Sequence, residues 1–538
     1  MAARPLATRP PAIVLLPLLA LLTAGAAGPA AGGGLPELEL GHRARIDDRL
    51  TVAAAAAAAR RAAATAALDT PEARRQAVDA LWGDGEPTAV KLAMFDQLWQ
   101  YVDAKYAAFQ GIDVDWPALR DRYRPEVAAG VSRGRFAAIM NQLALALRES
   151  HSLVIDLPVN VFTVPDRGVP LVAVGAWTFD PSGACTTAQD DGSALVYAAV
   201  PGHPLGLERG DRVLGYDGRP WRELMEELRA EELPLWPLYW GSSPSSFDHS
   251  WIMSSVQNWH LFSTMDVVKA NGDLVHVSTD PMEPTWIGWC SEQLDVPGVP
   301  MPRWWLDEYH SWGVVEGTRI GYIYSWGWLD GAEEAFAEAV YQLTQVERVE
   351  GLVLDYRYNF GGYVSASSTG LGLLFPHPEP TLGVDGRRRA DDHFAMKQLI
   401  PPSSLVMDFA GLSGWRVMES FDGPVAVLTG PGAVSSGDIT SYFSAALPWV
   451  RTFGKSSAAA VNLPTQPALG TEIDLHPDWV AVIAEGNFYQ VGAPHEYLTH
   501  RELPVDEPVW LTQQDVAAGR DTVAEAALRW LAQELGGD

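Results

Sequence analysis

Residues 424–439 read PVAVLTGPGAVSSGDI. The apolar first half predicts a buried strand over 424–429, and the Gly- and Pro-rich turn after it leads into a helix with Ile439 and Phe443 on one face. Ser435 stands at the junction between the two. A hydroxyl at the rim of a sheet, beside the positive end of a helix, has the placement of a nucleophile. An ordinary helix N-cap would give the same local pattern.

The sequence around this stretch alternates between strands and helices. Segments 320–325 and 352–356 predict buried strands, and Asp330 with Glu333 predicts a capping box for the helix between them. Strands that alternate with helices imply βαβ units, in which active groups lie at the ends of strands. We therefore expect a multidomain α/β protein with an α/β core over residues 313–538.

The first 26 residues have the features of a signal peptide. Arg4 and Arg9 give a basic start, an apolar run follows over 12–22, and small residues at 24–26 suit cleavage. The apolar run is short for a membrane span. We therefore expect an exported chain, periplasmic or extracellular, with no stable membrane insertion after signal cleavage. An uncleaved anchor is the alternative.

Three regions are expected between the signal peptide and the core. Residues 27–87 predict a linker with an Ala-rich helical segment, and residues 88–158 predict a helical region that ends in Ser150-His151 and a short strand. Residues 159–312 predict mainly β-structure with a Trp-rich insertion. Most of these Trp side chains are expected in cores, and some of them along a substrate channel.

Composition excludes several classes of partner and cofactor. The chain has 538 residues and a formal net charge of −29, and such an acidic surface repels phosphate backbones, so we expect no nucleic-acid partner. No H-E-x-x-H motif occurs and the 12 His residues are scattered, so we expect no metal and no other cofactor. Cys185 and Cys290 could pair in an oxidising compartment, and the sequence leaves open whether they do.

Two further segments could complete a site around Ser435. His151 follows a helix end, and a neutral imidazole can accept a hydroxyl proton near neutral pH, although a purely structural His is the alternative. Gly361-Gly362 follows a buried strand. Two successive N–H groups there could hold an oxyanion, or the pair could form a plain turn.

Together these segments resemble peptidase family S41, which includes the tail-specific proteases and a tricorn-like branch. Residues 354–362, LDYRYNFGG, resemble the family's L-D-x-R-x-N-x-G-G strand and loop. Residues 432–439, GAVSSGDI, resemble its G-x-x-S-x-x-[ED]-I nucleophile turn, and residues 196–218 resemble part of its PDZ-like domain. The resemblance covers residues 88–530. It implies a PDZ-like β domain over 159–312 and a ClpP/crotonase-like catalytic core.

The tail-specific branch uses a Ser/Lys dyad, and this chain departs from that pattern. Ala460 stands at the position of the family's Lys, and Lys455 lies five residues earlier. Ser150-His151 instead match the Ser-His pair of the tricorn-like branch. The resemblance also implies a late Glu that orients the base. Three residues are candidates for it: Glu502, which fits best, Glu496 and Glu507.

The resemblance implies a serine peptidase that acts on polypeptides. Ser435 would attack the peptide carbonyl, His151 would accept its proton, and Ser150 and Glu502 would hold the imidazole. The oxyanion would be bound by backbone N–H groups of Ser436 and of Gly361 or Gly362. The PDZ-like domain would bind peptide ends by strand addition. The sequence predicts neither the substrate nor the oligomeric state.

Three alternatives stay open on the sequence. The chain could be a catalytically inactive S41-like protein that binds a lipophilic or peptide ligand. It could be a peptidase that uses Lys455 as its base. It could be an unrelated hydrolase, although the absence of a G-x-S-x-G elbow around Ser435 disfavours an α/β-hydrolase.

Overall fold

A computed structural model of the chain describes residue 68 and residues 70–175, 179–238, 240–288, 290–303, 308–329, 331–372, 374, 381–404, 421–464, 473–492 and 494–536. The predicted signal peptide over 1–26 and most of the predicted linker over 27–87 lie outside the described residues, as does Asp330 of the predicted capping box.

The central sheet has the strand order β12-β13-β14-β17-β18-β23. Its strands are β12 (His310–Val314), β13 (Ile320–Ser325), β14 (Gly351–Asp355), β17 (Val425–Thr429), β18 (Val450–Gly454) and β23 (Glu507–Pro508). β12 is antiparallel to β13, and the other neighbouring pairs are parallel. Every residue of β13, β14 and β17 is buried, as expected of parallel strands that are covered on both faces. The three predicted strands are confirmed to within one residue at each end.

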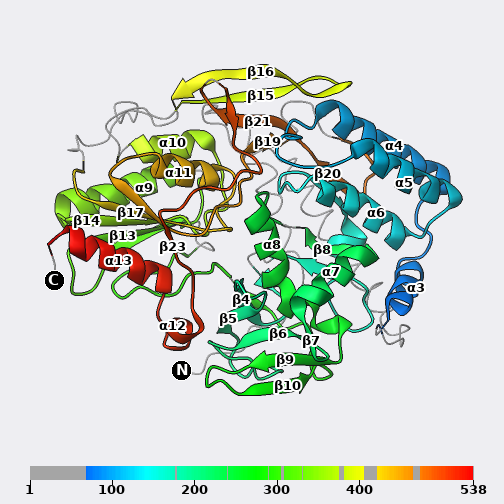
Figure 1. The fold of residues 1–538 in the computed structure, drawn as a ribbon, viewed down its shortest axis with the longest axis horizontal. Helices are drawn as coiled ribbons and strands as arrows, with labels where there is room; N and C mark the ends of the chain where they lie inside the picture. The colour runs from blue at the N-terminus through cyan, green and yellow to red at the C-terminus, as the bar shows by residue number, and fades with distance from the viewer. Residues whose placement is uncertain are drawn as a thin grey trace, which may run out of the picture.

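Helices cover both faces of this sheet (Figure 1). They are α9 (Ala332–Tyr341), α10 (Val364–Gly372), α11 (Ser436–Ala445) and α13 (Thr522–Glu534). Leu354 and Val427 pack towards α9 and α11, whereas Val353 and Leu428 pack towards α13, because successive strand residues point to opposite faces. The predicted α/β architecture is therefore confirmed.

A buried ion triad fixes the end of β14. Arg357 Nη2 lies 2.7 Å from Asp355 Oδ2 and 2.9 Å from Asp521 Oδ2, and all three side chains are buried. Asp521 is also the N-cap of α13, where it accepts hydrogen bonds from the N–H groups of Val523 and Ala524. The triad thus ties the loop after β14 to the helix beneath the sheet.

The described N-terminal residues form α3 (Pro71–Leu81), α4 (Thr88–Lys105), α5 (Trp116–Ala129) and α6 (Arg133–Ala146). Ser132 caps α6 as predicted, since its side chain accepts from the Arg135 N–H. The short strand after this helix is β1 (Leu153–Asp156), which pairs antiparallel with β20 (Trp479–Val482). This pairing brings the 149–151 turn from the helical region to the C-terminal part of the core.

The middle of the chain contains a sheet with the order β10-β9-β6-β5-β4. Its strands are β4 (Ala184–Ala188), β5 (Ala194–Ala199), β6 (Arg212–Tyr216) with β7 (Arg219–Pro220) beside it, β9 (Thr264–Val268) and β10 (Leu274–Ser278). The Trp-rich stretch differs from the expectation of mainly β-structure. It forms α7 (Trp221–Glu231), β8 (Leu235–Leu238), α8 (Pro244–Met253) and the 3-10 helix η2 (Ser254–Leu261). Trp236, Trp240, Trp251 and Trp259 are buried, so these four rings form core rather than a channel wall.

Cys185 and Cys290 form a disulfide, which answers the question that the sequence left open. It joins β4 to the segment after β11 (Ile287–Gly288), 105 residues later. In the described part of the chain no cysteine is free. The bond therefore ties the middle sheet to the segment that leads into the core.

A long β-ribbon projects above the core, as Figure 1 shows at its upper edge. It consists of β15 (Thr381–Arg389) and β16 (Asp392–Ser404), and it continues the sheet formed by β19 (Asn462–Pro464), β21 (Ala484–Gln490) and β22 (Glu496–Tyr497). The remaining short elements are η1 (Leu157–Val161), β2 (Val172–Val174), β3 (Phe179–Asp180), η4 (Gln342–Val346) and α12 (Gln513–Ala517).

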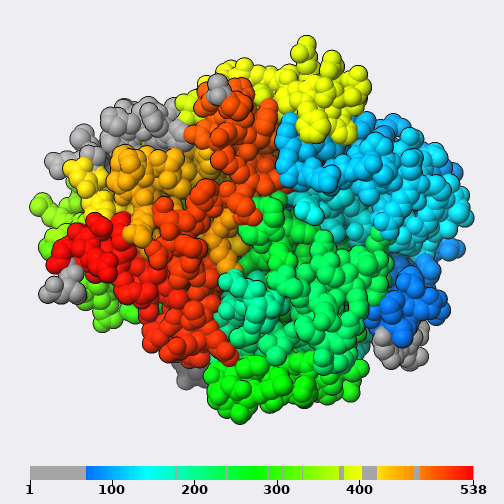
Figure 2. Space-filling view, viewed as in Figure 1, coloured from blue at the N-terminus to red at the C-terminus, as the bar shows by residue number. Residues whose placement is uncertain are grey.

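Figure 2 shows the orange-red part of the C-terminal segment running between the core and the rest of the chain on this face, and the red C-terminal end lying over the core. Among the residues that the structure describes, no helix combines the length and the apolar character that a membrane span needs.

Candidate active site

Ser435 occupies the tight bend between β17 and α11. Its backbone has φ 59° and ψ −118°, a conformation that non-glycine residues seldom adopt. It stands at the N-cap position of α11, but an ordinary N-cap has an extended backbone. The strained bend is therefore more than a simple cap, and strain of this kind is concentrated at functional sites.

Asp438 holds this bend in place. Its Oδ2 accepts the Ser435 N–H at 2.9 Å, and the same carboxylate accepts the N–H groups of Ala459 and Ala460 at 2.7 and 3.0 Å. Burial raises the pKa of Asp438 to about 6, although the hydrogen bonds from Ala459 and Ala460 oppose that rise. One buried carboxylate thus joins the Ser435 bend to the 459–460 segment.

The Gly361-Gly362 loop packs directly on this bend. A Cβ atom added at Gly361 would lie 2.7 Å from the Ser435 Cβ and 2.8 Å from the Val434 carbonyl oxygen. Both glycines have positive φ, 92° and 131°, so a side chain is excluded by backbone conformation as well as by space. The structure therefore brings the predicted glycine pair against the predicted nucleophile.

The hydrogen bonds of this loop decide which N–H groups can serve an oxyanion. The Gly361 N–H donates to Asn359 Oδ1 at 3.0 Å, and Ser436 Oγ donates to the Gly362 carbonyl oxygen at 2.8 Å. Within the described residues, the N–H groups of Gly362 and Ser436 donate no hydrogen bond. Of the predicted donors, Ser436 and Gly362 are thus available, whereas Gly361 is already engaged.

His151 lies in a turn after α6 with a buried carboxylate as its partner. Glu149 Oε1 accepts the His151 N–H at 2.9 Å and lies 3.1 Å from His151 Nδ1. Burial acts to raise the pKa of Glu149, but the hydrogen bonds and charge of His151 outweigh it and hold that pKa below its ordinary value. An ionised carboxylate only accepts hydrogen bonds, so it fixes the proton on Nδ1 and leaves Nε2 as the basic nitrogen.

His151 and Ser435 share one neighbourhood through Asp438. The charge of His151 is one of the influences that lower the pKa of Asp438, so the imidazole lies within electrostatic range of the carboxylate that binds the Ser435 N–H. In the described part of the chain, no hydrogen bond joins His151 to Ser435. Hydrogen bonds of this kind are often long without substrate and tighten when it binds.

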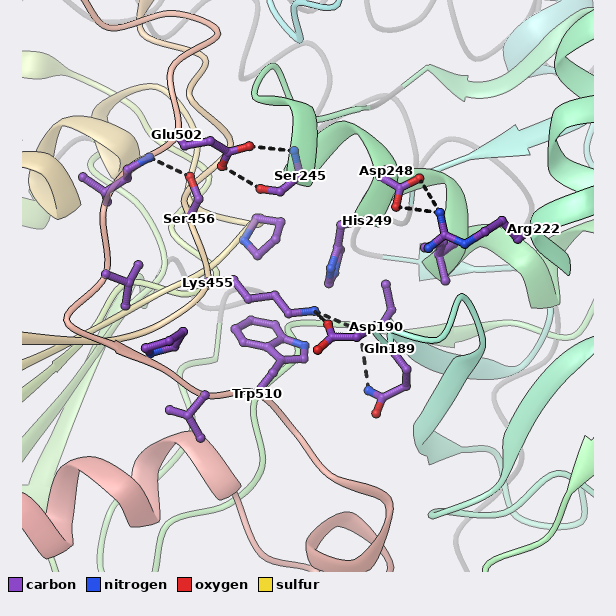
Figure 3. A pocket seen from close by; sticks show the side chains of 18 residues that line it. Gln189, Asp190, Arg222, Ser245, Asp248, His249, Lys455, Ser456, Glu502 and Trp510 are labelled. Atoms are coloured by element: carbon purple, nitrogen blue, oxygen red, sulfur yellow. Dashed lines mark hydrogen bonds and ion pairs between the residues drawn. The ribbon is translucent and has the colours of Figure 1, made fainter.

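The assignment of the orienting carboxylate requires a correction. Glu502 accepts the Ser245 N–H at 2.8 Å and the Ser245 hydroxyl at 2.7 Å, at the first turn of α8 (Figure 3). The fallback candidates have other partners, since Glu496 binds Arg501 and Glu507 binds Arg451. The carboxylate that contacts the imidazole is Glu149, two residues before His151 in the same turn.

The role expected of Ser150 also changes. Its N–H donates to Ser242 Oγ at 3.3 Å, and its own buried hydroxyl has no hydrogen-bond partner within the described residues. Ser150 therefore makes no contact that would hold the imidazole, because Glu149 already occupies Nδ1.

His500 is a further buried group beside this turn, and the sequence patterns did not point to it. Its Nε2 lies 3.1 Å from the Tyr106 hydroxyl and 3.1 Å from the Ala108 carbonyl oxygen, and its Nδ1 lies 3.1 Å from the Ser242 carbonyl oxygen. Burial lowers the pKa of His500, although Glu149 acts to raise it. His500 thus connects the residues that follow α4 with the C-terminal segment, close to Glu149.

Lys455 lies away from this group of residues. Its Nζ donates to the Ala188 carbonyl oxygen at 3.1 Å and lies 3.7 Å from Asp190 Oδ1, in a cavity beside the middle sheet (Figure 3). These contacts disfavour the alternative in which Lys455 is the base. Among the described residues, no group of three or more His, Cys, Asp or Glu side chains could hold a metal ion.

Two family models match separate parts of the chain. The model of peptidase family S41 matches residues 319–475, and the model of the tricorn protease C1 domain matches residues 87–144. No curated protein matches the sequence.

Solved structures of three proteases align with the chain at low sequence identity, and the structure of mature CPAF shares its fold. The structure of mature CPAF is 12% identical with a TM-score of 0.55, over 84% of this chain and 98% of that one. The photosystem II D1 C-terminal processing protease is 13% identical with a TM-score of 0.39, over 79% of this chain and 94% of that one. The tricorn protease is 16% identical with a TM-score of 0.37, over 84% of this chain and 37% of that one.

Proposed function

We propose that this chain, a serine peptidase of family S41, cleaves polypeptides with Ser435 as its nucleophile and His151 as its general base. The observation that supports this most is the strained Ser435 bend, which is packed against Gly361 and held by Asp438. The same fold brings a histidine with a buried carboxylate partner into the electrostatic range of that bend.

The reaction would proceed through an acyl-enzyme. Ser435 Oγ bonds to the peptide carbonyl carbon while His151 Nε2 accepts the hydroxyl proton. The imidazolium then donates that proton to the leaving amine as the C–N bond breaks. A water molecule, activated by the same nitrogen, releases the acyl group and restores Ser435. Glu149 stabilises the imidazolium in both halves of the cycle.

The N–H groups of Ser436 and Gly362 would bind the oxyanion of the tetrahedral intermediates. They lie beside Ser435 and donate no hydrogen bond within the described residues. Ser436 also stands at the first turn of α11, where the helix dipole favours negative charge. Donors of this kind typically contribute about 10²–10³ in rate.

The middle sheet of β4, β5, β6, β9 and β10 would act as a PDZ-like module that binds peptide ends. We also propose that the protein acts in an oxidising compartment, the periplasm or the extracellular space. The Cys185–Cys290 disulfide supports this, because such bonds persist mainly in exported proteins. Cell fractionation with an antibody to the chain tests the location, and detection in the cytosol alone would contradict it.

Activity-based labelling tests the mechanism. Wild type, Ser435→Ala and His151→Ala are treated with a fluorophosphonate probe and, separately, with casein. We expect labelling and casein cleavage in wild type only. A wild-type protein that neither labels nor cleaves would favour the inactive binding protein, and a Ser435→Ala protein that keeps its activity would rule out Ser435.

A further inference from the structure

The cavity that contains Lys455 lies between the middle sheet and the core. Its volume is about 520 Å³, in the usual range for sites that bind small molecules. It is lined by the β4–β5 turn, by α8 and by core segments that include Pro431, Lys455 and Trp510 (Figure 3). Neither Ser435 nor His151 lines it.

Lys455 is the central charged group of this cavity. Its ammonium lies 5.2 Å from the centre of the Trp510 ring and makes one hydrogen bond, to the Ala188 carbonyl oxygen. Its nearest carboxylate, Asp190, is 3.7 Å away and has a fully exposed side chain. Burial lowers the pKa of Lys455, although Asp190 and Glu292 act to raise it. An ammonium has three donors, so Lys455 can donate further hydrogen bonds besides the one to Ala188.

His249 forms another part of the wall. Its Nε2 lies 2.7 Å from Glu292 Oε1, and both side chains are buried. Its Nδ1 has no hydrogen-bond partner within the described residues. Glu292 has φ 56°, so the partner of this histidine is held in a conformation that non-glycine residues seldom adopt.

The other charged groups of the cavity already have protein partners. Asp248 pairs with Arg222 at 3.2 Å, and both oxygens of Glu502 bind Ser245. The rest of the wall is mainly apolar and includes Pro431, Leu503, Val505, Pro508 and Val509. The cavity therefore combines one ammonium that has unused hydrogen-bond donors with surfaces that suit a hydrocarbon chain.

We propose that this cavity binds a small organic carboxylate, with the carboxylate on Lys455 Nζ and the hydrocarbon part against Trp510. The exposed side chain of Asp190 would rotate away from Lys455 into solvent when the ligand binds. Two sources offer this chemistry, namely the C-terminal end of a short peptide and a free organic acid. The cavity is separate from Ser435, although Pro431, which lines the cavity, belongs to the loop that leads to Ser435.

Calorimetry with three probes tests this proposal. The probes are N-acetyl-Ala-Ala-Val with a free carboxylate, its C-terminal amide, and glutarate. The proteins are wild type, Lys455→Met and Lys397→Met. Lys397 is a matched control because it is an exposed lysine on β16, outside the cavity.

We expect wild type and Lys397→Met to bind a carboxylate probe equally well. Lys455→Met should bind it at least about tenfold more weakly, and the amide should lose a similar factor in wild type, because charge-assisted hydrogen bonds are the strong ones. Tighter binding of the peptide than of glutarate identifies a peptide end as the ligand, and the reverse order identifies a free acid. If no carboxylate binds, or if Lys455→Met binds as wild type does, the proposal is overturned.

A measurement on the wild-type protein covers the case in which Lys455→Met does not fold. The chain has only five lysines, so reductive ¹³C-methylation gives a simple NMR spectrum. The Lys455 signal is assigned by its loss in Lys455→Arg. It should shift with the free-carboxylate peptide and not with the amide. An unchanged Lys455 signal at saturating carboxylate would overturn the proposal independently of activity at Ser435.

Discussion

Two buried histidine–glutamate pairs lie in different parts of this molecule. Glu149 and His151 belong to one turn, and Glu149 holds Nδ1, so that Nε2 remains basic. His249 and Glu292 are 43 residues apart, and here Glu292 holds Nε2 instead. In both pairs the hydrogen bond and charge of the histidine outweigh burial and lower the pKa of the glutamate.

The surroundings of the two pairs differ more than the pairs themselves. Glu149–His151 lies within electrostatic range of the carboxylate that holds the Ser435 bend. His249–Glu292 faces Lys455 and Trp510, with no strained hydroxyl among the residues that line its cavity. A carboxylate-held imidazole is therefore not sufficient for catalysis, because the nucleophile and its oxyanion donors must share its neighbourhood.

Removal of each histidine gives the largest expected contrast. His151→Ala should lower kcat for peptide hydrolysis by at least about 10³, because the base is lost. His249→Ala should lower it by less than about tenfold, since its ring contacts no reacting group. Steady-state kinetics on a peptide substrate checks both, and similar losses in the two variants would mean that the pairs are not functionally distinct.

The choice of orienting carboxylate can be tested within the first pair. Glu149→Gln should reduce kcat by about 10²–10⁴ with little change in KM, since the amide no longer stabilises the imidazolium. Glu502→Gln should change kcat by less than about threefold, because its carboxylate caps α8 through Ser245. A larger loss of kcat in Glu502→Gln than in Glu149→Gln would instead support Glu502 as the carboxylate that orients His151.

The contact between the glycine loop and Ser435 predicts that a side chain at Gly361 lowers the stability of the protein as well as its activity. Gly361→Ala would place a methyl group 2.8 Å from the Val434 carbonyl oxygen at φ 92°, so we expect a loss of at least about 3 kcal/mol of stability together with activity. Gly202→Ala has positive φ but open space, and should cost only about 1 kcal/mol. Chemical denaturation of both variants measures the difference, and equal losses would contradict close packing at Gly361.

Asp438 predicts the smallest effect, a change in pH dependence. Its pKa in the folded chain, about 6, is above the value of 3.8 for an unperturbed Asp, so the folded state binds this proton more tightly. Its contribution to stability is therefore greatest below about pH 4 and is lost as pH rises through about 6. Protonation of Asp438 should therefore raise the Tm of wild type as the pH falls from 8 to 5. This part of the rise should be absent in Asp438→Asn. Identical pH profiles of Tm in wild type and variant would show that Asp438 does not titrate in this range.

The sequence predicted the core well because its signals are local. The strands at 320–325, 352–356 and 424–429 are continuous apolar runs, and such runs predict buried parallel strands without further information. The Ser435 bend was predicted for the same reason, since a buried strand, a small-residue turn and a helix follow one another directly.

Features that depend on distant partners were missed or left open. No local pattern marks Glu149 as the partner of His151, and the family resemblance implies a late Glu instead. The disulfide could not be predicted because it depends on the distance between the two cysteines. The fold brings their Cα atoms to 5.2 Å from each other, and the sequence does not give this distance. The β15–β16 ribbon is not predicted by the sequence, since neither the largely buried β15 nor the more exposed β16 shows a regular alternation of apolar and polar residues.

The pairing of β1 with β20 has a consequence for the time before folding is complete. His151, the proposed base, is brought to the core by the pairing of residues 153–156 with residues 479–482, which are made late in synthesis. A nascent or partly folded chain then has the nucleophile segment but no assembled proton acceptor. On the proposed mechanism, the chain would not cleave peptides until residues 479–482 have been made and have paired with β1.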